Sequence, residues 1–322
     1  LATAERADVV VIAPATAHAI AKVACGLADD ALTTTVLATR APIIVCPAMD
    51  GHMYENPATQ ENIEKLKSRG YTIAGPAEGH LASGLSGPGR LLETAEIVGH
   101  IRQTLGRDGD LAGRKIVVSA GGTQEAIDPV RFISNRSSGK MGFAIAEAAR
   151  DRGAATVVVA GPTDLPDPVG VKVKRVITAL EMKHAIVSKC QDADALIMAA
   201  AVADWSAATV ASQKLKKDTA DRWTVELTKN PDILSELRSD YLVRVGFAAE
   251  SQNLEENARA KLTSRGLDLV VANDITVEGS GFDSDTNKVM LLGRDGDVEE
   301  LGLLSKYEVG NRILDRLSRL MS

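Results

Sequence analysis

Aromatic side chains and cysteines are both scarce in this sequence. Aromatic residues make up 3% of the 322 residues, so few surfaces exist on which nucleic-acid bases could stack. The three cysteines, Cys25, Cys46 and Cys190, lie in apolar stretches and lack the close spacing of metal ligands. We therefore predict reduced thiols that pack inside a cytoplasmic protein, and we exclude a disulfide scaffold.

Long apolar runs and an excess of positive charge are also absent. No stretch approaches the ~18 apolar residues of a membrane-spanning helix, which excludes an integral membrane protein. The formal net charge is −6 without a basic face, which argues against a nucleic-acid partner. A hydrophobic share of 45% and a charged share of 25% are typical of a globular chain, here long enough for two domains. Residues 1–8 lead directly into a strand pattern, so we expect an N-terminus cut within a domain.

β-branched runs alternate with amphipathic helical patterns along the whole chain, which predicts parallel sheets built from βαβ units. In the first part we expect strands at 9–13, 43–46 and 71–74 and helices at 17–27, 57–69 and 92–105. A flexible linker is expected at 106–110. In the second part we expect strands at 116–119, 156–160, 195–198, 243–247, 269–272 and 289–292, and helices at 141–152, 178–189, 231–239, 254–265 and 305–320. The second set is sufficient for a doubly wound domain.

The glycine-rich segment at 119–142 is the most informative part of the sequence. Near its start, directly after an expected strand, stand Gly121, Gly122 and Thr123. Near its end, directly before an expected helix, stand Asn135, Ser137, Ser138, Gly139 and Lys140. Backbone N–H groups at a helix N-terminus attract anions, so we favour a phosphate site over an ordinary turn without a ligand. A P-loop is excluded, because Ser134 and Met141 stand where it requires Gly and Ser or Thr.

Further candidate residues follow the carboxyl ends of other expected strands, where ligands of parallel sheets bind. Small residues at 199–203 precede Asp204, and three lysines fall within 214–217. The lysines are either a flexible arm that closes on a polyphosphate or a solvated loop. The glycine-rich loop 82–90 is either a lid or a simple loop.

In their order along the chain, these segments match a known family. The matching segments are 121–123, 133–142, 200–204, 214–217, 229–233 and 246–250. The chain resembles, over nearly its whole length, the bifunctional phosphopantothenoylcysteine decarboxylase/phosphopantothenate–cysteine ligases of coenzyme A biosynthesis. The resemblance implies an α/β fold with two Rossmann-like three-layer domains. These are a flavodoxin-like flavoprotein domain at 1–112, truncated at its N-terminus, and a doubly wound ligase domain at 113–322.

For the ligase domain the resemblance implies a reaction in two steps. CTP activates the carboxylate of 4′-phosphopantothenate as an acyl-cytidylate, and the amine of cysteine then displaces CMP. Lys214, with Mg²⁺ or Mn²⁺, is implied in the first step and Asn135 in the second. The residues implied for CTP are Met198, Ala199, Ala200, Asp204, Lys214, Pro231, Asp232, Ile233, Leu234, Phe247, Lys261 and Arg265, the last standing where the family usually has lysine. The residues expected to bind phosphate or substrate are Gly121, Gly122, Thr123, Ser137, Ser138, Gly139 and Lys140.

For the first domain the resemblance implies FMN-dependent decarboxylation of 4′-phosphopantothenoylcysteine to 4′-phosphopantetheine. The implied residues are Pro14, Ala15 and Thr16 for FMN, Asp50 and Met53 for substrate, and Ser83 for catalysis. Asp50 and Ser83 replace the family's asparagine and proton-donating cysteine, so we expect Asp50 to donate the proton if its pKa is raised. The family's flavin-phosphate loop and catalytic histidine would precede Leu1, so we expect decarboxylation to need that segment.

The resemblance also implies a cytoplasmic homo-oligomer that acts on small molecules, without a nucleic-acid or membrane partner. Two alternatives remain open. One is an NAD(P)-dependent oxidoreductase, although segment 121–123 lacks the third glycine of the dinucleotide fingerprint. The other is a flavoprotein-like regulatory binding module, which Asp50 and Ser83 suggest for the first domain only.

Overall fold

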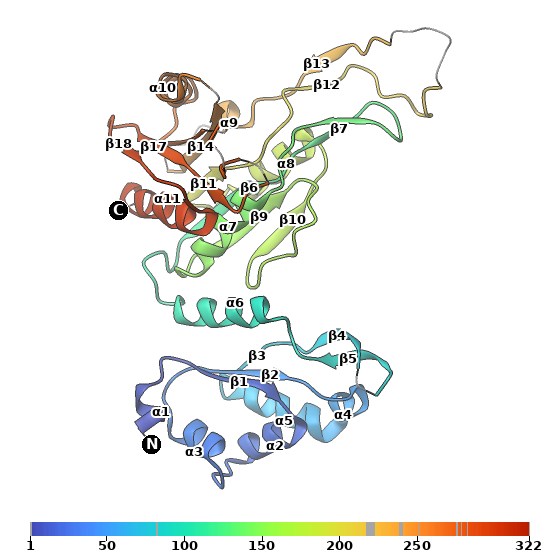
Figure 1. Ribbon diagram of the computed structural model, residues 1–322, viewed down its shortest axis with the longest axis vertical. Helices are drawn as coiled ribbons and strands as arrows, with labels where there is room; N and C mark the ends of the chain where they lie inside the picture. Colours follow the sequence, from blue (N-terminus) through green and yellow to red (C-terminus); the bar gives the residue numbers. More distant parts are fainter. Residues whose placement is uncertain are drawn as a thin grey trace. The chain divides into compact units, whose positions relative to one another are not determined.

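The computed structural model has two α/β units. The structure describes residues 2–81, 83–216, 223–237, 241–250, 252–274, 276–277, 279–281 and 283–321. Contacts divide the chain into Leu1–Arg107 and Asp108–Ser322, a few residues before the boundary expected after 112. Each unit has its own sheet and its own apolar cores, so each is described by itself (Figure 1). In the described part of the chain, no helix is long and apolar enough to cross a membrane.

The first unit is a three-layer α/β structure around a small parallel sheet. Its elements are α1 (Ala2–Arg6), β1 (Val10–Ala15), α2 (Ala17–Cys25), α3 (Ala31–Ala38), β2 (Ile43–Pro47), α4 (Gly51–Glu55), α5 (Pro57–Ser68), β3 (Thr72–Ile73), β4 (Ala77–His80), β5 (Ser86–Arg90) and α6 (Thr94–Leu105). The sheet order is β1-β2-β3. Ile12 and Val45 pack on one face with α2, α3 and α5, while Ile44 and Cys46 pack on the other with α6. The alternation of side chains along each strand thus supplies both faces with apolar groups.

The second unit is doubly wound around an eight-stranded sheet. Its main strands are β6 (Lys115–Ala120), β9 (Ala155–Ala160), β10 (Lys172–Arg175), β11 (Ala195–Met198), β14 (Val243–Glu250), β15 (Leu269–Asp274), β17 (Val289–Gly293) and β18 (Val298–Glu300). Its helices are α7 (Lys140–Arg150), α8 (Ala179–Lys189), α9 (Ile233–Glu236), α10 (Leu254–Arg265) and α11 (Lys306–Leu320). The order is β10-β9-β6-β11-β14-β15-β17-β18, with α7 and α11 on one face and α8 and α10 on the other (Figure 1). The expected α/β class with two Rossmann-like domains is confirmed.

Three short two-stranded ribbons border this sheet. They are β7–β8 (Gln124–Ala126 with Phe132–Ser134), β12–β13 (Trp205–Ala207 with Leu227–Lys229) and β16–β19 (Thr286–Asn287 with Leu304–Ser305). The sequence did not predict them, because two or three residues are too few for a period of two to be recognised.

Several sequence expectations are wrong in detail. The second sheet is not wholly parallel, because β17 runs antiparallel to both of its neighbours, β15 and β18. The helix expected at 231–239 is limited to α9, and residues 238–240 lie outside the described residues. Residues 2–6 form α1 rather than a direct approach to the strand. Cys46 and Cys190 are buried thiols, but Cys25 is exposed at the end of α2.

The glycine-rich loop expected at 82–90 is partly a strand. β5 pairs with β4 as an antiparallel hairpin, and the amide of Met49 donates to the Gly89 carbonyl at 2.9 Å. A Cβ at Gly89 would lie 2.1 Å from the Met49 carbonyl oxygen, so this close approach requires glycine. The glycines therefore allow the hairpin to pack on the loop after β2.

Candidate active site

A cavity of 620 Å³ lies at the carboxyl ends of the central strands of the second unit. It is lined by residues 135–142, 198–204, 229–234, 247–249, 261, 265, 273, 281, 287 and 306. These positions belong to β11, β14 and β15 and the segments that follow them, to the N-termini of α7, α9 and α11, to α10, and to β13 and β16. Ligands of open parallel sheets bind at this edge.

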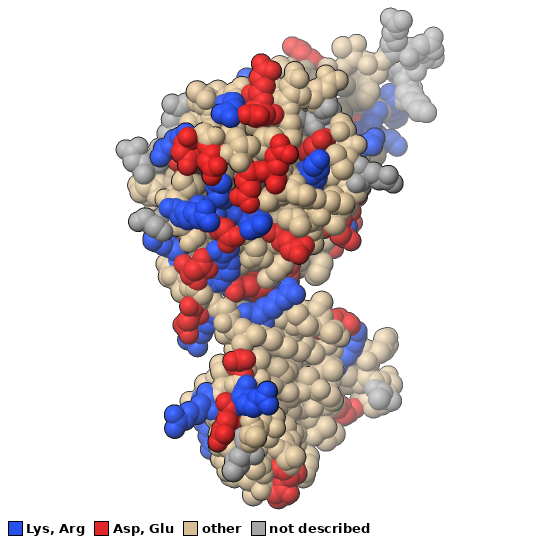
Figure 2. Space-filling model, turned by 60° about the vertical axis from the view of Figure 1, so that its left-hand side comes forward, with Lys and Arg blue, Asp and Glu red and all other residues tan. Residues whose placement is uncertain are grey.

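The cavity is strongly cationic, although the chain as a whole is acidic. Its lining contains six basic side chains and two carboxylates: Arg136, Lys140, Lys229, Lys261, Arg265 and Lys306, with Asp204 and Asp232. The formal net charge of the whole chain is −6. On the face seen in Figure 2, basic and acidic side chains are instead interspersed. A concave site of one sign concentrates ligands of the opposite sign, so this cavity suits a polyanion.

One wall of the cavity, residues 199–203, is held from behind by the glycine-rich turn after β6. The Gly121 carbonyl accepts from the Ala201 amide at 2.9 Å, and the Thr123 hydroxyl accepts from the Ala203 amide at 2.9 Å. Gly121, Gly122 and Thr123 are buried and do not line the cavity. The structure gives these three residues a supporting role behind the wall, and their direct contact with phosphate stays a prediction.

Asn135 lies beside the same wall and lines the cavity. Its side-chain amide donates to the carbonyls of Ala201 and Val202, at 3.3 and 3.4 Å. It follows directly after β8, so the β7–β8 hairpin sets its position. The geometry joins Asn135 to the backbone next to Ala199 and Ala200, which also line the cavity.

The N-terminus of α7 opens into the cavity without a side-chain cap. Gly139 is the N-cap residue and makes no side-chain hydrogen bond to the first turn. Ser137, Ser138 and Lys140 line the cavity at the same place. Lys140 donates to the Asp285 carboxylate at 2.7 Å and to the Asp283 carbonyl at 2.8 Å. Backbone N–H groups and the helix dipole thus make this end suitable for an anion.

A second group of expected ligand residues lies around α9 and α10. Asp232 caps α9 and forms an ion pair with Arg265. Lys261 donates to the Phe247 carbonyl at 2.5 Å. All four residues line the cavity, as do Met198, Asp204, Pro231, Ile233 and Leu234. The structure therefore brings together these residues, which are far apart in sequence, while their part in nucleotide binding stays a prediction.

Lys214 is exposed and does not line the cavity, but the segment that carries it is anchored. The buried Asp128 carboxylate accepts from the Leu215 amide at 3.2 Å and from the Arg131 guanidinium at 2.6 Å. Arg131 also donates to the Leu215 carbonyl at 2.7 Å and lies 4.7 Å from the Trp223 ring centroid. Burial raises the pKa of Asp128, but Arg131 and the backbone amides lower it by more, so the carboxylate stays ionised. Lys217, the last lysine of the arm, lies outside the described residues.

The sequence analysis gave no role to three polar residues that line the cavity and lie outside the segments matched to the family. Asn273, Asn287 and Lys306 are all buried. The Asn287 carboxamide oxygen accepts from the Gly281 amide at 3.1 Å, and the Asn273 oxygen accepts from the Ser280 hydroxyl at 3.0 Å. Asn273 directly follows the strand expected at 269–272, and this position is the signal that could have identified it. Asn287 and Lys306 stand among residues without a recognisable motif, so the sequence carries no signal for them.

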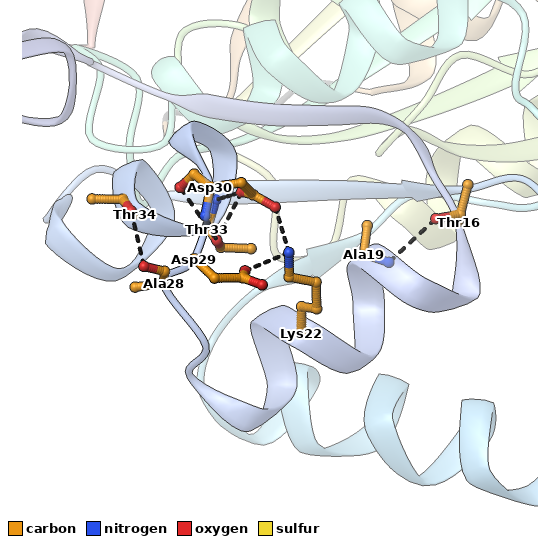
Figure 3. A network of polar contacts seen from close by, with 8 residues as sticks. All are labelled: Thr16, Ala19, Lys22, Ala28, Asp29, Asp30, Thr33 and Thr34. Atoms are coloured by element: carbon orange, nitrogen blue, oxygen red, sulfur yellow. Dashed lines mark hydrogen bonds and ion pairs between the residues drawn. The ribbon is translucent and has the colours of Figure 1, made fainter.

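In the first unit, the expected FMN residues stand where β1 ends and α2 begins. Thr16 caps α2, its hydroxyl accepting from the Ala19 amide at 3.2 Å (Figure 3). At the other end of α2, Lys22 binds the carboxylates of Asp29 and Asp30, the latter at 2.5 Å (Figure 3). The Ala48 amide donates to the Ala15 carbonyl at 3.0 Å, which joins the ends of β1 and β2.

Asp50 and Ser83 meet next to this edge. The Ser83 hydroxyl and the His52 amide donate to the Asp50 carboxylate and lower its pKa. The expected raised pKa of Asp50 is therefore wrong, and Asp50 is a poor proton donor near neutral pH. Met53 is 50% exposed on α4.

The comparisons with known proteins agree with this arrangement. The family described as "Flavoprotein" matches residues 1–106, and the family described as "DNA/pantothenate metabolism flavoprotein C-terminal domain" matches residues 111–321. The chain is 46% identical over 322 residues to the "Coenzyme A biosynthesis bifunctional protein CoaBC" of Vibrio parahaemolyticus, covering 99% of this chain and 80% of that protein. It is 47% identical over 316 residues to the protein of that name from Escherichia coli K12, covering 97% and 78%. The crystal structure of a CoaBC C-terminal domain has 38% identity and a TM-score of 0.57, covering 66% of this chain and 98% of that domain.

The fold and the site define a two-unit α/β enzyme, in which a flavoprotein unit precedes a unit with a cationic cavity of 620 Å³. The chain belongs to the family of bifunctional coenzyme A biosynthesis proteins, as the resemblance predicted. It is accordingly an enzyme of coenzyme A biosynthesis with ligase and decarboxylase functions. Neither the oxidoreductase alternative nor the purely regulatory one agrees with this membership.

Proposed function

We propose that the second unit joins 4′-phosphopantothenate to cysteine at the expense of CTP. An oxygen of the substrate carboxylate attacks the α-phosphorus of CTP, and pyrophosphate leaves. The cysteine amine then attacks the acyl carbon, loses a proton, and CMP leaves. The observation that carries this proposal is the cavity in which six basic side chains face two carboxylates, because both substrates bring phosphate groups.

The lining suggests a place for each substrate. We assign CTP to the side with Met198–Ala200, Asp204, 231–234, Phe247, Lys261 and Arg265. The small side chains of 199–201 leave room for a ring or sugar to approach the backbone. We assign phosphate groups to the uncapped α7 N-terminus with Ser137, Ser138, Gly139 and Lys140.

Mg²⁺ fits this site only together with the nucleotide. Within the described residues, no group of three or more His, Cys, Asp or Glu side chains could hold a metal ion. Mg²⁺ commonly uses one or two carboxylates and completes its shell with substrate phosphates and water. Of the two carboxylates in the lining, Asp232 is paired with Arg265, so we assign the metal contact to Asp204.

For the first unit we propose FMN-dependent decarboxylation of the ligation product. FMN, when bound, would oxidise the cysteine thiol so that the adjacent carboxylate can leave. Pro14, Ala15 and Thr16 fit such a group, because they stand at the carboxyl end of β1 and lead into α2. Asp50 accepts a hydrogen bond from Ser83 and stays ionised, so it holds the Ser83 hydroxyl in place and does not supply the proton.

We further propose that the protein is a cytoplasmic homo-oligomer. Large apolar side chains are exposed on two hairpins that project from the second unit (Figure 1): Phe132 on β8, Trp205 on β12 and Leu227 on β13, with Val130 and Trp223 beside them. An exposed apolar patch of this kind favours association. The three cysteines are free thiols, which agrees with a reducing compartment.

Pyrophosphate release tests the ligase proposal. The protein is given CTP, Mg²⁺ and 4′-phosphopantothenate, with pantothenate as the control substrate, and pyrophosphate is measured. If Lys214 offsets charge in the transition state, Lys214→Gln slows release by roughly 10²–10³-fold and weakens CTP binding less. Lys216→Gln is the matched control, since Lys216 is an exposed lysine on the same segment. Release that is independent of CTP contradicts the proposal, and equal rates for both variants contradict the role of Lys214.

A further inference from the structure

Lys306 is a buried lysine at one end of the ligase cavity. The residue is 4% exposed and lines the cavity. Its ammonium donates to the Gly281 carbonyl at 3.0 Å, and its amide donates to the Asp285 carbonyl at 3.0 Å. It is the first residue of α11, whose N-cap Ser305 forms a capping box with Glu308. Backbone and side chain together fix where this charge lies.

Lys140 occupies the corresponding position on the neighbouring helix. Both lysines begin a helix, and Asp285 joins the two helix N-termini, because its carboxylate accepts from the Lys140 ammonium at 2.7 Å and its carbonyl accepts from the Lys306 amide at 3.0 Å. The Lys140 ammonium is held by Asp285, whose side chain is 88% exposed. Asp283 and Asp285 do not line the cavity, whereas both lysines do.

We propose that Lys306 is a phosphate-binding residue of the ligase reaction, which with Lys140 and the first turn of α7 forms a two-ammonium site for one phosphate group. This proposal rests on the proposed ligase function and adds a residue to its site. Charge-assisted hydrogen bonds to phosphate are about twice as strong as neutral ones. Two helix N-termini next to each other add to the attraction. The phosphate belongs either to the acyl substrate or to the CTP triphosphate, and the experiment separates these sources.

The environment of Lys306 links phosphate binding to proton uptake. Burial, followed by the nearby Lys140 ammonium, lowers its pKa to about 8, while Asp285 and Asp283 act in the opposite direction. Lys140 faces Lys306 from α7, and Asp283 and Asp285 face it from the segment before β16. A bound phosphate favours the ammonium form and raises this pKa. Around pH 8 the free protein therefore takes up a fraction of a proton on binding, and affinity weakens as the pH rises above 8.

Isothermal titration calorimetry tests this proposal on the full chain. The probes are 4′-phosphopantothenate with pantothenate as its control, and CTP–Mg²⁺ with cytidine as its control. Each is titrated at pH 7 and pH 8 in two buffers of different ionisation enthalpy, which reports proton uptake. The ligand phosphate monoester has a second pKa of about 6 and adds little at pH 8.

We expect wild-type protein to take up protons at pH 8 with at least one phosphorylated probe. Lys306→Met should weaken that probe by about 10- to 100-fold and leave its dephosphorylated control unchanged. Lys306→Arg keeps the charge at every pH, so it should retain most of the affinity but lose the proton uptake. Lys288→Met is the matched control, because Lys288 is an exposed lysine next to β16 that does not line the cavity.

The pattern of losses identifies the phosphate. Weaker binding of 4′-phosphopantothenate alone assigns Lys306 to the acyl substrate, and weaker binding of CTP alone assigns it to the triphosphate. Unchanged affinity for both in Lys306→Met, or wild-type titrations without proton uptake, overturns the proposal. If the wild-type protein still releases pyrophosphate from CTP in that case, the ligase function stands and only Lys306 is excluded. If Lys306→Met folds poorly, Lys306→Arg, which keeps the charge, and the wild-type titrations still test the proposal.

Discussion

Lysines of the second unit differ in role because they differ in surroundings. Lys214 is exposed on an anchored segment, Lys140 is paired with an exposed carboxylate, and Lys306 is buried against backbone carbonyls. The first two stand in clusters of polar residues and were predicted. Lys306 stands between Ser305 and Tyr307 without a motif, and its neighbours at Gly281 and Asp285 come from other parts of the chain. The pKa and the hydrogen bonds of Lys306 therefore depend on its burial and on partners that lie elsewhere in the sequence.

Asn135→Asp is predicted to block the second step of ligation while sparing the first. An aspartate here would place a carboxylate oxygen near the carbonyls of Ala201 and Val202, to which the asparagine amide now donates. We expect pyrophosphate release within a few-fold of wild type, and formation of the cysteine adduct reduced by about 10²-fold or more. Quenched-flow assays with and without cysteine measure the two steps. The matched control is Ser212→Ala, at an exposed position outside the cavity lining. A normal rate of adduct formation in Asn135→Asp contradicts the assignment.

At the scale of elements, α7 contributes its N-terminus to the cavity. Its N-cap is glycine without a side-chain cap, so the first turn keeps N–H groups for a ligand. Its contact with β6 is close at Gly142, where a Cβ would lie 2.6 Å from the Ala120 Cβ and 2.8 Å from the Ser119 carbonyl oxygen. Periodicity located this helix within a residue or two, but only packing on β6 reveals why its third residue is glycine.

Gly142→Ala is predicted to destabilise the protein and weaken CTP binding together. Alanine favours a helix over glycine by up to about 1 kcal/mol, but overpacking against a buried strand costs about 1–3 kcal/mol. β6 is buried and cannot move without disturbing the core, so the net effect is destabilising. The added methyl group also displaces the N-terminus of α7. Urea unfolding and calorimetric CTP titration measure the two effects. Gly302→Ala is the control, because a Cβ there meets no atom within 4 Å. If neither variant changes the free energy of unfolding, this explanation is contradicted.

For the whole molecule, the exposed apolar hairpins lead to a prediction about assembly. Phe132 is 52% exposed on β8, and Phe132→Asp places a charge in the proposed interface. We expect the dissociation constant of the assembly to rise at least about 10-fold, since interface aromatics often carry more than 1 kcal/mol. Sedimentation velocity over a concentration series measures it. Leu303→Asp is the control, because Leu303 is 50% exposed but lies outside the two hairpins. A wild-type protein that sediments as a monomer at every concentration contradicts the homo-oligomer.

The sequence by itself determined the α/β class, most of the strands and helices, and the anion-attracting turn before α7. These features depend on local periodicity and on glycine, and neighbouring residues carry that information. The resemblance added Lys261 and Arg265, which spacing alone would not have joined to residues 135–142.

Only the tertiary structure decided which side chains face the cavity. Thr123 was expected at a phosphate, but it is buried and its hydroxyl accepts a hydrogen bond from the Ala203 amide. Asp50 was expected to be a proton donor, but a hydrogen bond from Ser83 keeps it ionised. Hydrogen bonds, burial and pKa values depend on groups far away along the chain, and folding alone brings those groups together.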